Sequence, residues 1–376
     1  MLTLLASLLM VRPLVMAHYM PWYESKPVSG KWGWHWTMNH FDPEKRDADG
    51  RQQLASKYRP IIGAYDSSDP DTLECQTLQM KLAGIDGVFI DWYGTKDLYD
   101  YPILHRNTQR MIDACTKAEL KFSIVLEDQV VPNLMKAGKS TSDEFAKSAL
   151  AFMSGNWFKQ PGYLRWNGKP VLLIFGPQFY KEPDLNRLFS RDVALFTELG
   201  PQGPAVGAFG WPEPQVGSAK SWDQLGNYYQ RATHWTASIP VAYPRFEDIY
   251  KAAGIGPGYG SIGDGNGATF KKSMDLAMSA KAPFIQIATW NDWGEGTQIE
   301  PSVEFGYRDL EGLQVARHKL DPQFSFKAAD LTLPAKLYAL RKQGKSLSRL
   351  NQAALDLFAG RVAEARTILN NSEKSG

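Results

Sequence analysis

Two carboxylic acids and two glycines stand close together in the segment Trp290–Gly296, which reads WNDWGEG. Asp292 and Glu295 are three residues apart, and Gly294 and Gly296 flank Glu295, so the backbone can turn sharply there. Cleavage of a glycosidic bond needs one carboxyl group that protonates the leaving oxygen and one that acts on the opposite side of the reacting carbon. The segment therefore predicts an acid pair for sugar hydrolysis. The alternative is a structural turn in which Asp292 caps a helix N-terminus.

Further acids and aromatic residues are expected around this pair. Trp290 and Trp293 can wall a pocket and raise the pKa of a neighbouring acid by excluding water. Glu127 and Asp128 are adjacent at the end of an expected strand, so their side chains should point to opposite faces. We expect one of the two to orient substrate hydroxyls, while Asp91 is a competing carboxylate. Glu300 is interpreted as a structural ion-pair residue instead.

Other catalytic chemistries find little support in the residue pattern. The six histidines include no H-x-x-x-H or H-x-H pair, so we predict no metal site and no cofactor. A G-x-S-x-G nucleophile elbow is absent, and the glycine-rich Gly263–Gly267 is not followed by Lys-Ser/Thr, as a phosphate loop would be. Cys75 and Cys115 lack C-x-x-C spacing and are expected to be buried thiols.

Composition narrows the choice of partner. The net charge is only +2, and no Lys/Arg run is interleaved with aromatic residues, so nucleic acid is not an expected partner. In contrast, the chain holds 12 Trp, 16 Tyr and 18 Phe, many of them beside Gly, Pro, Asn or Asp in expected loops. Aromatic rings pack well on the flat C–H faces of sugars, although most aromatic residues in proteins belong to the core. We therefore expect an oligosaccharide or polysaccharide as the partner; the sequence does not predict an oligomeric state.

The elements that must position these residues alternate between β-rich runs and amphipathic stretches. Eight runs are expected to be strands: 14–20, 60–65, 87–91, 121–126, 170–175, 205–209, 238–241 and 284–289. The expected helices are 71–83, 104–118, 142–154, 185–199, 245–253, 270–280 and 306–318. Eight strands alternating with helices predict an α/β fold, a (β/α)8 TIM barrel. An open doubly wound sheet is the alternative, but no G-x-G-x-x-G follows the first strand.

The ends of the chain differ in composition from the middle. Residues 1–12 begin with an apolar run that resembles a signal-peptide core but is too short to span a bilayer and has no preceding basic segment. Residues 13–319 are expected to form the barrel, and residues 320–376 a short helical C-terminal extension. On this basis we predict a periplasmic or secreted protein without a membrane span.

Several motifs occur in the order found in a known family. They are Tyr19-x-Pro21-Trp22-Tyr23, Ser67–Pro70, Gly87–Tyr93, Gly256–Tyr259 and Trp290–Glu300. Together they resemble glycoside hydrolase family 99, the endo-α-1,2-mannosidase and endo-α-1,2-mannanase family. The resemblance covers roughly residues 14 to 305, and the last motif is the most specific.

The resemblance implies a (β/α)8 enzyme that retains anomeric configuration without a metal. One carboxylate would deprotonate the sugar 2-hydroxyl, giving a 1,2-anhydro intermediate, and this role falls on Asp292. A second carboxyl would act as acid and then as base, and this role falls on Glu295. With the residues singled out above, the predicted substrate-binding set is Tyr19, Trp22, Trp92, Glu127, Tyr259, Asn291 and Trp293.

The chain departs from the family pattern at two positions of the last motif. The family typically has Glu where this chain has Asp292, and His where it has Gly294. The shorter side chain moves the carboxylate by about an ångström, and a misplacement of that size can cost ~100-fold in rate. The expected function is hydrolysis of α-linked glycans, and the resemblance implies glycans of the α-mannan type. The alternatives are the same barrel acting on another α-linked polysaccharide and a non-catalytic carbohydrate-binding barrel.

Overall fold

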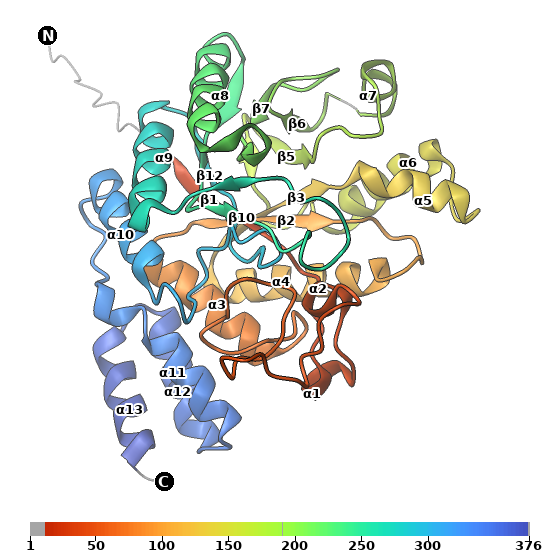
Figure 1. The fold of residues 1–376 in the computed structure, drawn as a ribbon. Coiled ribbons are helices and arrows are strands. Elements are labelled where there is room, and N and C mark those ends of the chain that lie inside the picture. Colours follow the sequence, from red (N-terminus) through yellow and green to blue (C-terminus); the bar gives the residue numbers. More distant parts are fainter. Residues whose placement is uncertain (1–11, 190, 375–376) are drawn as a thin grey trace, which may run out of the picture.

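A computed structural model describes residues 12–189 and 191–374 of the chain (Figure 1). The signal-like segment predicted at residues 1–12 falls almost wholly outside the described residues. Parallel strands form a ring in the order β8-β7-β6-β5-β3-β2-β1-β12-β9. They are β1 (Leu14–Tyr19), β2 (Gly87–Trp92), β3 (Lys121–Leu126), β5 (Lys169–Ile174), β6 (Ala194–Glu198), β7 (Gly207–Phe209), β8 (Ala237–Ile239), β9 (Val241–Ala242) and β12 (Phe284–Ile287).

The ring is completed by one strand that a proline divides into two segments. β8 pairs with β7, whereas β9 pairs with β12, and only Pro240 separates the two segments. Proline has no N–H to give to the ladder, so regular pairing is interrupted at this residue. The Pro240 carbonyl still accepts a hydrogen bond from the Gln286 N–H at 2.8 Å. The nine segments therefore amount to eight barrel strands, and the predicted (β/α)8 fold is confirmed.

Alternation along each strand separates the side chains into two cores. On β2, Phe89 belongs to the cluster inside the ring, whereas Ile90 and Trp92 belong to the cluster between strands and helices. On β1, Met16 packs inside and Tyr19 packs outside. Because successive strand residues point to opposite faces, this parity decides which residues at a strand end face the barrel mouth.

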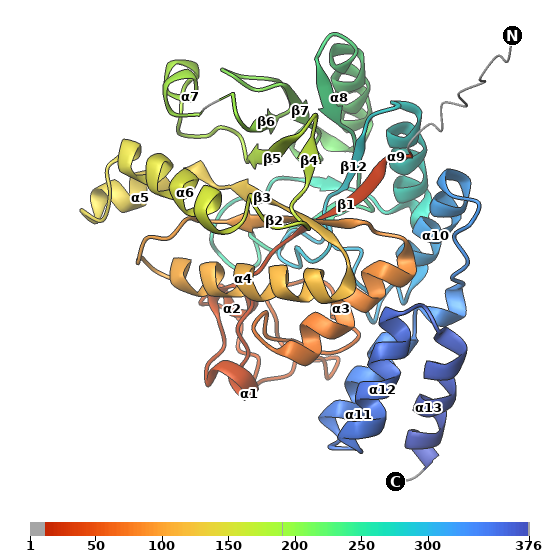
Figure 2. The ribbon, with the colours of Figure 1, turned by 180° about the vertical axis from the view of Figure 1, so that it is seen from behind.

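Helices cover the outside of the ring (Figures 1 and 2). The long ones around the barrel are α3 (Pro70–Ala83), α4 (Tyr101–Ala118), α6 (Ser142–Asn156), α8 (Gly217–Ala232), α9 (Ala268–Ser279) and α10 (Arg308–Leu320). The connection between β1 and α3 is a long excursion that carries only α1 (Lys26–Ser29) and α2 (Trp34–Thr37). Short helices α5 (Val131–Lys136) and α7 (Glu182–Leu188) follow β3 and β5. No helix of the described residues is long and apolar enough to cross a membrane.

Three further helices follow the barrel: α11 (Leu333–Lys342), α12 (Leu347–Phe358) and α13 (Val362–Lys374). They form a bundle below the barrel and pack mainly on α3. Ion pairs fasten the bundle: Arg341 Nε lies 2.8 Å from Glu74 Oε1, and Lys342 Nζ lies 2.7 Å from Asp69 Oδ2. These helices are the predicted C-terminal extension.

Three of the expected elements were wrong. Residues 60–65 form a turn rather than a strand, because Gly63 at φ 82° reverses the chain. The strand that brings the ring to eight is instead β6, which lies between β5 and β7. It falls inside the stretch 185–199, which was expected to be helical. The short run of β6 is buried in the ring and its tertiary pairing overrides helical propensity. Residues 245–253 are not a helix; they hold β10 (Phe246–Glu247), which pairs with β11 (Ser261–Ile262).

Candidate active site

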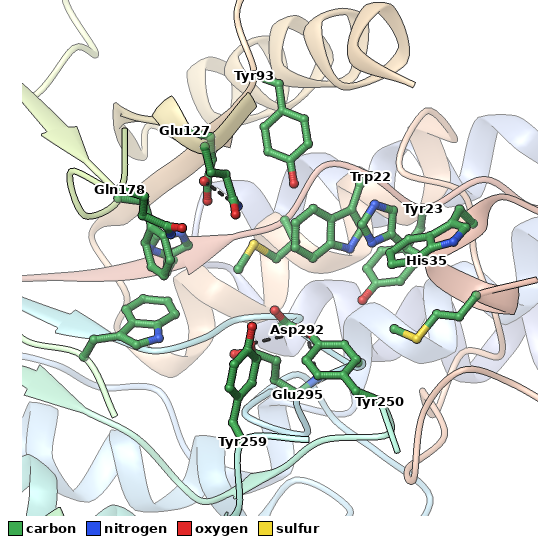
Figure 3. A pocket seen from close by; sticks show the side chains of 18 residues that line it. Trp22, Tyr23, His35, Tyr93, Glu127, Gln178, Tyr250, Tyr259, Asp292 and Glu295 are labelled. Carbon is green, nitrogen blue, oxygen red and sulfur yellow. Dashed lines mark hydrogen bonds between the residues drawn. The ribbon is translucent and has the colours of Figure 1, made fainter. Parts of the chain in front are cut away.

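A cavity of about 300 Å³ opens at the C-terminal ends of the barrel strands (Figure 3). This is the face on which active sites of such barrels lie. It is lined by His18, Met20, Trp22, Tyr23, Trp34, His35, Met38, Tyr93, Glu127, Gln129, Phe175, Gln178, Trp211, Tyr250, Tyr259, Asp292, Gly294 and Glu295. Within the described part of the chain, the lining holds three carboxylates and neither lysine nor arginine.

Asp292 lies in the turn that follows β12 and is 4% exposed. Its Oδ1 accepts a hydrogen bond from the Glu295 N–H at 2.9 Å, and its own N–H donates to Thr289 Oγ1 at 2.8 Å. Burial raises the pKa of Asp292 to about 6, although the backbone N–H groups act in the opposite direction. The side chain thus both caps the turn and borders the cavity, so the two interpretations of Asp292 are compatible.

Glu295 lies on the same cavity wall, beside Asp292. Burial and the nearby Asp292 charge hold its pKa well above the ordinary range. Tyr250 Oη donates to Glu295 Oε1 at 3.3 Å. The main chain is fixed as well, because the Glu247 N–H donates to the Glu295 carbonyl at 2.8 Å. Gly296 has φ 68°, and a Cβ there would lie 2.7 Å from the Glu247 carbonyl oxygen, so the turn requires glycine.

A second pair of acids lies across the cavity, at the ends of β2 and β3. Burial raises the pKa values of Asp91 and Glu127, and the proximity of the two carboxyl groups raises that of Glu127 further. Gln129 Nε2 donates to Glu127 Oε2 at 2.7 Å. The neighbouring Asp128 turns away and accepts hydrogen bonds from the backbone N–H groups of residues 178–180. Only one member of the adjacent pair faces the mouth, as strand parity predicts, and it is Glu127.

Among the described residues, no group of three His, Cys, Asp or Glu side chains is placed to share a metal ion. The available chemistry is therefore that of the carboxyl groups themselves: proton donation, proton removal and hydrogen bonding to hydroxyls. Their surroundings give the two acids different pKa values: that of Asp292 is raised to about 6, and that of Glu295 is raised further. A base and an acid with separated pKa values beside one cavity can act on the same bond.

Comparison with known proteins relates the chain to one family of enzymes. The model of glycosyl hydrolase family 99 matches residues 11–194. A glycoprotein endo-alpha-1,2-mannosidase-like protein from Danio rerio is 24% identical over 326 residues, which cover 76% of this chain and 70% of that protein. The glycoprotein endo-alpha-1,2-mannosidase of Rattus norvegicus is 20% identical over 328 residues, covering 77% and 68% of the two chains. The chain is therefore similar to glycoside hydrolase family 99, and the family model covers its first half.

The fold of this chain also has a solved counterpart. The GH99 endo-alpha-mannosidase from Bacteroides thetaiotaomicron superimposes with a TM-score of 0.63 at 19% identity. The match covers 82% of this chain and 97% of that one. The barrel architecture is therefore shared.

Three predicted substrate-binding residues of this hydrolase line the cavity: Trp22, Glu127 and Tyr259. Trp22 stacks on His35 with ring centroids 4.0 Å apart and planes 5° apart. Tyr259 is 56% exposed, and its N–H donates to Asp248 Oδ2 at 2.7 Å, which holds the loop after β10 near the rim. The predicted catalytic residues border the same space (Figure 3).

The other four predicted substrate-binding residues lie behind the cavity wall. Tyr19 and Trp92 point to the outer core, where Tyr19 Oη donates to Gln76 Oε1 at 2.8 Å and Trp92 Nε1 donates to His105 Nδ1 at 3.1 Å. The remaining two, Asn291 and Trp293, are fully buried. Strand parity explains the first two cases, since Trp92 follows the inward Asp91 and must point outward. Their assignment to the substrate-binding surface is thereby corrected.

Asn291 and Trp293 brace the wall instead. Asn291 Oδ1 accepts from the Met20 N–H at 2.8 Å, and its Nδ2 donates to the Met20 carbonyl at 3.0 Å, which joins the loop after β1 to the turn after β12. Trp293 Nε1 lies 3.1 Å from both Tyr65 Oη and Glu300 Oε2. These contacts fix the backbone on both sides of Asp292.

Glu300 was expected to form an ion pair, but its partners are neutral. Tyr65 and Gln76 each donate to its carboxylate at 2.7 Å, in addition to Trp293. Burial raises the pKa of Glu300 to about 7, while these donors lower it. Sequence spacing could not reveal this arrangement, because its donors come from distant parts of the chain.

Several lining residues were missed by the sequence analysis. Tyr250 was missed because residues 245–253 were expected to form a helix, and the stretch contains no Gly or Pro that would have argued against one. Tyr93 could have been found, because it follows Asp91 by two residues and so shares its face at the end of β2. Gln178 and Phe175 come from the end of β5 and gave no local signal beyond that position.

Proposed function

We propose that this hydrolase cleaves α-linked glycans of the α-mannan type, retaining anomeric configuration through the sugar 2-hydroxyl. The observation that supports this most is the meeting of Asp292 and Glu295 in one cavity, with raised pKa values and neither lysine nor arginine in the described lining. The names of the relatives, which act on α-mannosides, support mannose as the reacting sugar.

In the first step, Asp292 removes the proton of the 2-hydroxyl, and the oxygen attacks the anomeric carbon. Glu295 gives its proton to the leaving oxygen as the glycosidic bond breaks, so a 1,2-anhydro sugar forms. In the second step, Glu295 removes a proton from water, which attacks the anomeric carbon and opens the three-membered ring. Asp292 returns the proton to the 2-oxygen, and both carboxyl groups regain their initial states.

This scheme requires Asp292 ionised and Glu295 protonated in the resting enzyme. The pKa of Asp292 is raised to about 6, and that of Glu295 is raised further by burial and by the Asp292 charge. Activity should therefore fall below about pH 6 as Asp292 is protonated, and fall again at high pH as Glu295 ionises. A bell-shaped pH dependence of kcat/KM is expected.

The test is hydrolysis of α-linked manno-oligosaccharides, followed by proton NMR to identify the anomer released first. Retention is expected, and Glu295→Gln and Asp292→Asn should each lower kcat by about 10²–10⁴-fold. Glu311→Gln, an exposed acid on α10, is the matched control and should leave the rate unchanged. Initial release of the inverted anomer, or full activity of Glu295→Gln, would contradict the mechanism.

A second candidate rests on Asp292. One of its carboxylate oxygens already accepts the Glu295 N–H, and its side chain is short, so its reach into the cavity is limited. The same barrel could therefore act on another α-linked polysaccharide, or bind carbohydrate without cleaving it. Turnover of a glucan in preference to mannan would favour the first, and micromolar binding without turnover on a broad panel would favour the second.

We also propose that the protein acts in the periplasm or outside the cell, because a polymeric glycan does not cross a membrane. The apolar run within residues 1–12 supports this proposal. Fusion of residues 1–30 to alkaline phosphatase, which is active only after export, tests it. An inactive fusion with full expression would contradict it.

A further inference from the structure

His18 lies on β1 at the floor of the catalytic cavity and has no role in the mechanism above. Its side chain points inside the ring, as that of Met16 does, and it lines the cavity although it is only 1% exposed. Its carbonyl accepts a hydrogen bond from the Trp290 N–H at 2.7 Å. A polar side chain is therefore held at the cavity by the strand end that leads to Asp292.

Two aromatic rings fix the His18 ring from the sides. The Trp211 ring lies edge-on to it with centroids 4.8 Å apart, and the Phe175 ring lies edge-on at 6.2 Å. Trp211 and Phe175 also contact each other edge-on, with centroids 4.9 Å apart. A cluster packed in this way leaves the imidazole little freedom to turn, so the nitrogen that faces the cavity stays there.

The His18 ring is neutral. Burial lowers its pKa to about 3, and the neighbouring Gln286 amide opposes only part of that shift. A neutral imidazole has one N–H donor and one nitrogen acceptor, and its surroundings decide which nitrogen has which role.

Gln286, on the adjacent strand β12, determines the two roles. Its Nε2 donates to the Gly210 carbonyl at 3.1 Å, which orients the amide. Its Oε1 is buried without a hydrogen-bond partner among the described residues, and so is His18 Nδ1. A proton on Nδ1 provides the donor that Gln286 Oε1 lacks and leaves Nε2 as the acceptor. Because Nδ1 is covered by protein while the ring lines the cavity, Nε2 is the nitrogen that a ligand reaches.

A bound sugar has hydroxyls that need such an acceptor. In the proposed mechanism, the 2-hydroxyl meets Asp292 and the glycosidic oxygen meets Glu295, so the remaining ring hydroxyls point to other parts of the cavity. A hydroxyl that loses its water on binding needs a new hydrogen-bond partner. Nε2 of the neutral imidazole supplies one without adding charge to the three carboxylates of the described lining.

We propose that His18 Nε2 accepts a hydrogen bond from one hydroxyl of the reacting sugar, other than the 2-hydroxyl, and thereby contributes to the choice of sugar. The inference rests on the proposed hydrolytic function and deepens it. Asp292 and Glu295 act on the bond that breaks, whereas His18 recognises a hydroxyl remote from that bond and removes no proton from it.

The experiment combines altered substrates with variants. kcat/KM is measured for an α-linked manno-oligosaccharide and for analogues whose reacting sugar lacks the 3-, 4- or 6-hydroxyl. In the wild-type protein, one of these analogues should lose the His18 contact, at a cost of about 5- to 100-fold in kcat/KM. His18→Phe keeps a ring beside Trp211 and Phe175 but has no acceptor. It should lower kcat/KM for the parent substrate by a similar factor and cause no additional loss on that analogue.

Two further variants accompany this comparison. His18→Gln offers a neutral amide acceptor and should recover part of the loss on the parent substrate. His318→Phe, the same substitution at an exposed position of α10, is the matched control and should leave every rate unchanged.

A purely structural role of His18 gives a different pattern, because His18→Phe would then lower kcat/KM equally for the parent and for all analogues. Such additive losses, or a wild-type kcat/KM of His18→Phe on the parent, would overturn the inference and leave the hydrolytic function intact. Where the protein binds the series without cleaving it, the same coupling is expected in Kd. If wild-type protein neither binds nor cleaves any member, the proposed function itself fails.

Discussion

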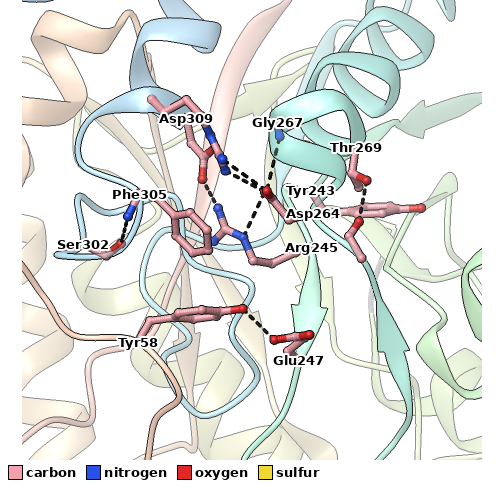
Figure 4. A network of polar contacts seen from close by, with 12 residues as sticks. Tyr58, Tyr243, Arg245, Glu247, Asp264, Gly267, Thr269, Ser302, Phe305 and Asp309 are labelled. Atoms are coloured by element: carbon pink, nitrogen blue, oxygen red, sulfur yellow. Dashed lines mark hydrogen bonds and ion pairs between the residues drawn. The ribbon is translucent and has the colours of Figure 1, made fainter. Parts of the chain in front are cut away.

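Acids removed from solvent occur in two neighbouring regions of the molecule, and the two regions differ in whether a cation lies beside them. At the barrel mouth, Asp292 and Glu295 lie together with neither lysine nor arginine in the described cavity lining. Beside β12, Asp264 and Asp309 lie around the fully buried Arg245 (Figure 4). Desolvation disfavours a carboxylate in both places, but only the second region supplies opposite charge.

The arginine network is well provided with partners. Arg245 contacts Asp309, its Nε lies 3.4 Å from Asp264, and Arg308 Nη2 lies 2.6 Å from Asp264. The Arg245 guanidinium also stacks on Phe305, with its carbon 3.8 Å from the ring centroid. These contacts serve to hold the fold.

The two regions are connected through the backbone. Arg245 Nη1 donates to the Gln298 carbonyl at 2.9 Å, just after the catalytic turn. Two residues beyond Arg245, the Glu247 N–H donates to the Glu295 carbonyl. The charge-compensated region thus holds the uncompensated one in place. The acids at the barrel mouth and those around Arg245 thus differ in whether a cation accompanies them.

The comparison predicts its largest effect at Arg245. Arg245→Met keeps an apolar stem under Phe305 but leaves Asp309 without its closest cation, so the free energy of unfolding should fall by about 3–5 kcal/mol. Urea denaturation measures this. Lys271→Met, which removes the exposed pair with Asp275, is the matched control and should change stability by less than about 1 kcal/mol. Equal effects of the two substitutions would contradict the comparison.

At the barrel mouth, a substitution that removes a charge is expected to raise the free energy of unfolding. Glu127 has a raised pKa in the folded state, so the folded protein binds a proton more tightly than the unfolded chain does. Its contribution is most favourable below the unfolded pKa of about 4.3 and is lost as pH rises toward the folded pKa. Glu127→Gln should therefore stabilise the protein by about 1–2 kcal/mol at pH 8 and by much less at pH 4.

Thermal unfolding of both proteins across this pH range measures the difference. Glu311→Gln, which alters an exposed acid, should give no comparable pH-dependent gain. A variant that is less stable than wild type at pH 8 would show that Glu127 is compensated after all, and the distinction between the two regions would not hold.

Local sequence was sufficient for the barrel and for the turn after β12. The short apolar, β-rich runs of β1, β2, β3 and β5 and the amphipathic α4 are visible without tertiary information. β6 was missed because its five residues follow a helical stretch and are defined by pairing with β5 and β7. Residues 245–253 failed for the same reason, since β10 exists through its pairing with β11 and the catalytic turn.

The site was predicted only in part, and strand parity explains several of the residues that were misplaced. Carboxylates that follow strands were found, and parity predicted that only one of Glu127 and Asp128 would face the mouth. Applied to β2 it would also have excluded Trp92 and included Tyr93, which the motif resemblance obscured. Residues such as Asn291 could not be assigned from sequence, because its partner Met20 lies 271 positions away.

The smallest effect concerns Tyr250, whose hydroxyl is the described side-chain donor to Glu295. This hydrogen bond favours the ionised carboxylate and lowers the pKa of Glu295, against the larger effects of burial and of Asp292. Tyr250→Phe should therefore raise that pKa and move the high-pH limb of the kcat/KM profile upward by a fraction of a unit, less than about 1 kcal/mol. The limb near pH 6, assigned to Asp292, should stay in place. Tyr259→Phe is the control, and a downward shift of the high-pH limb in Tyr250→Phe would mean that Glu295 is not the acid.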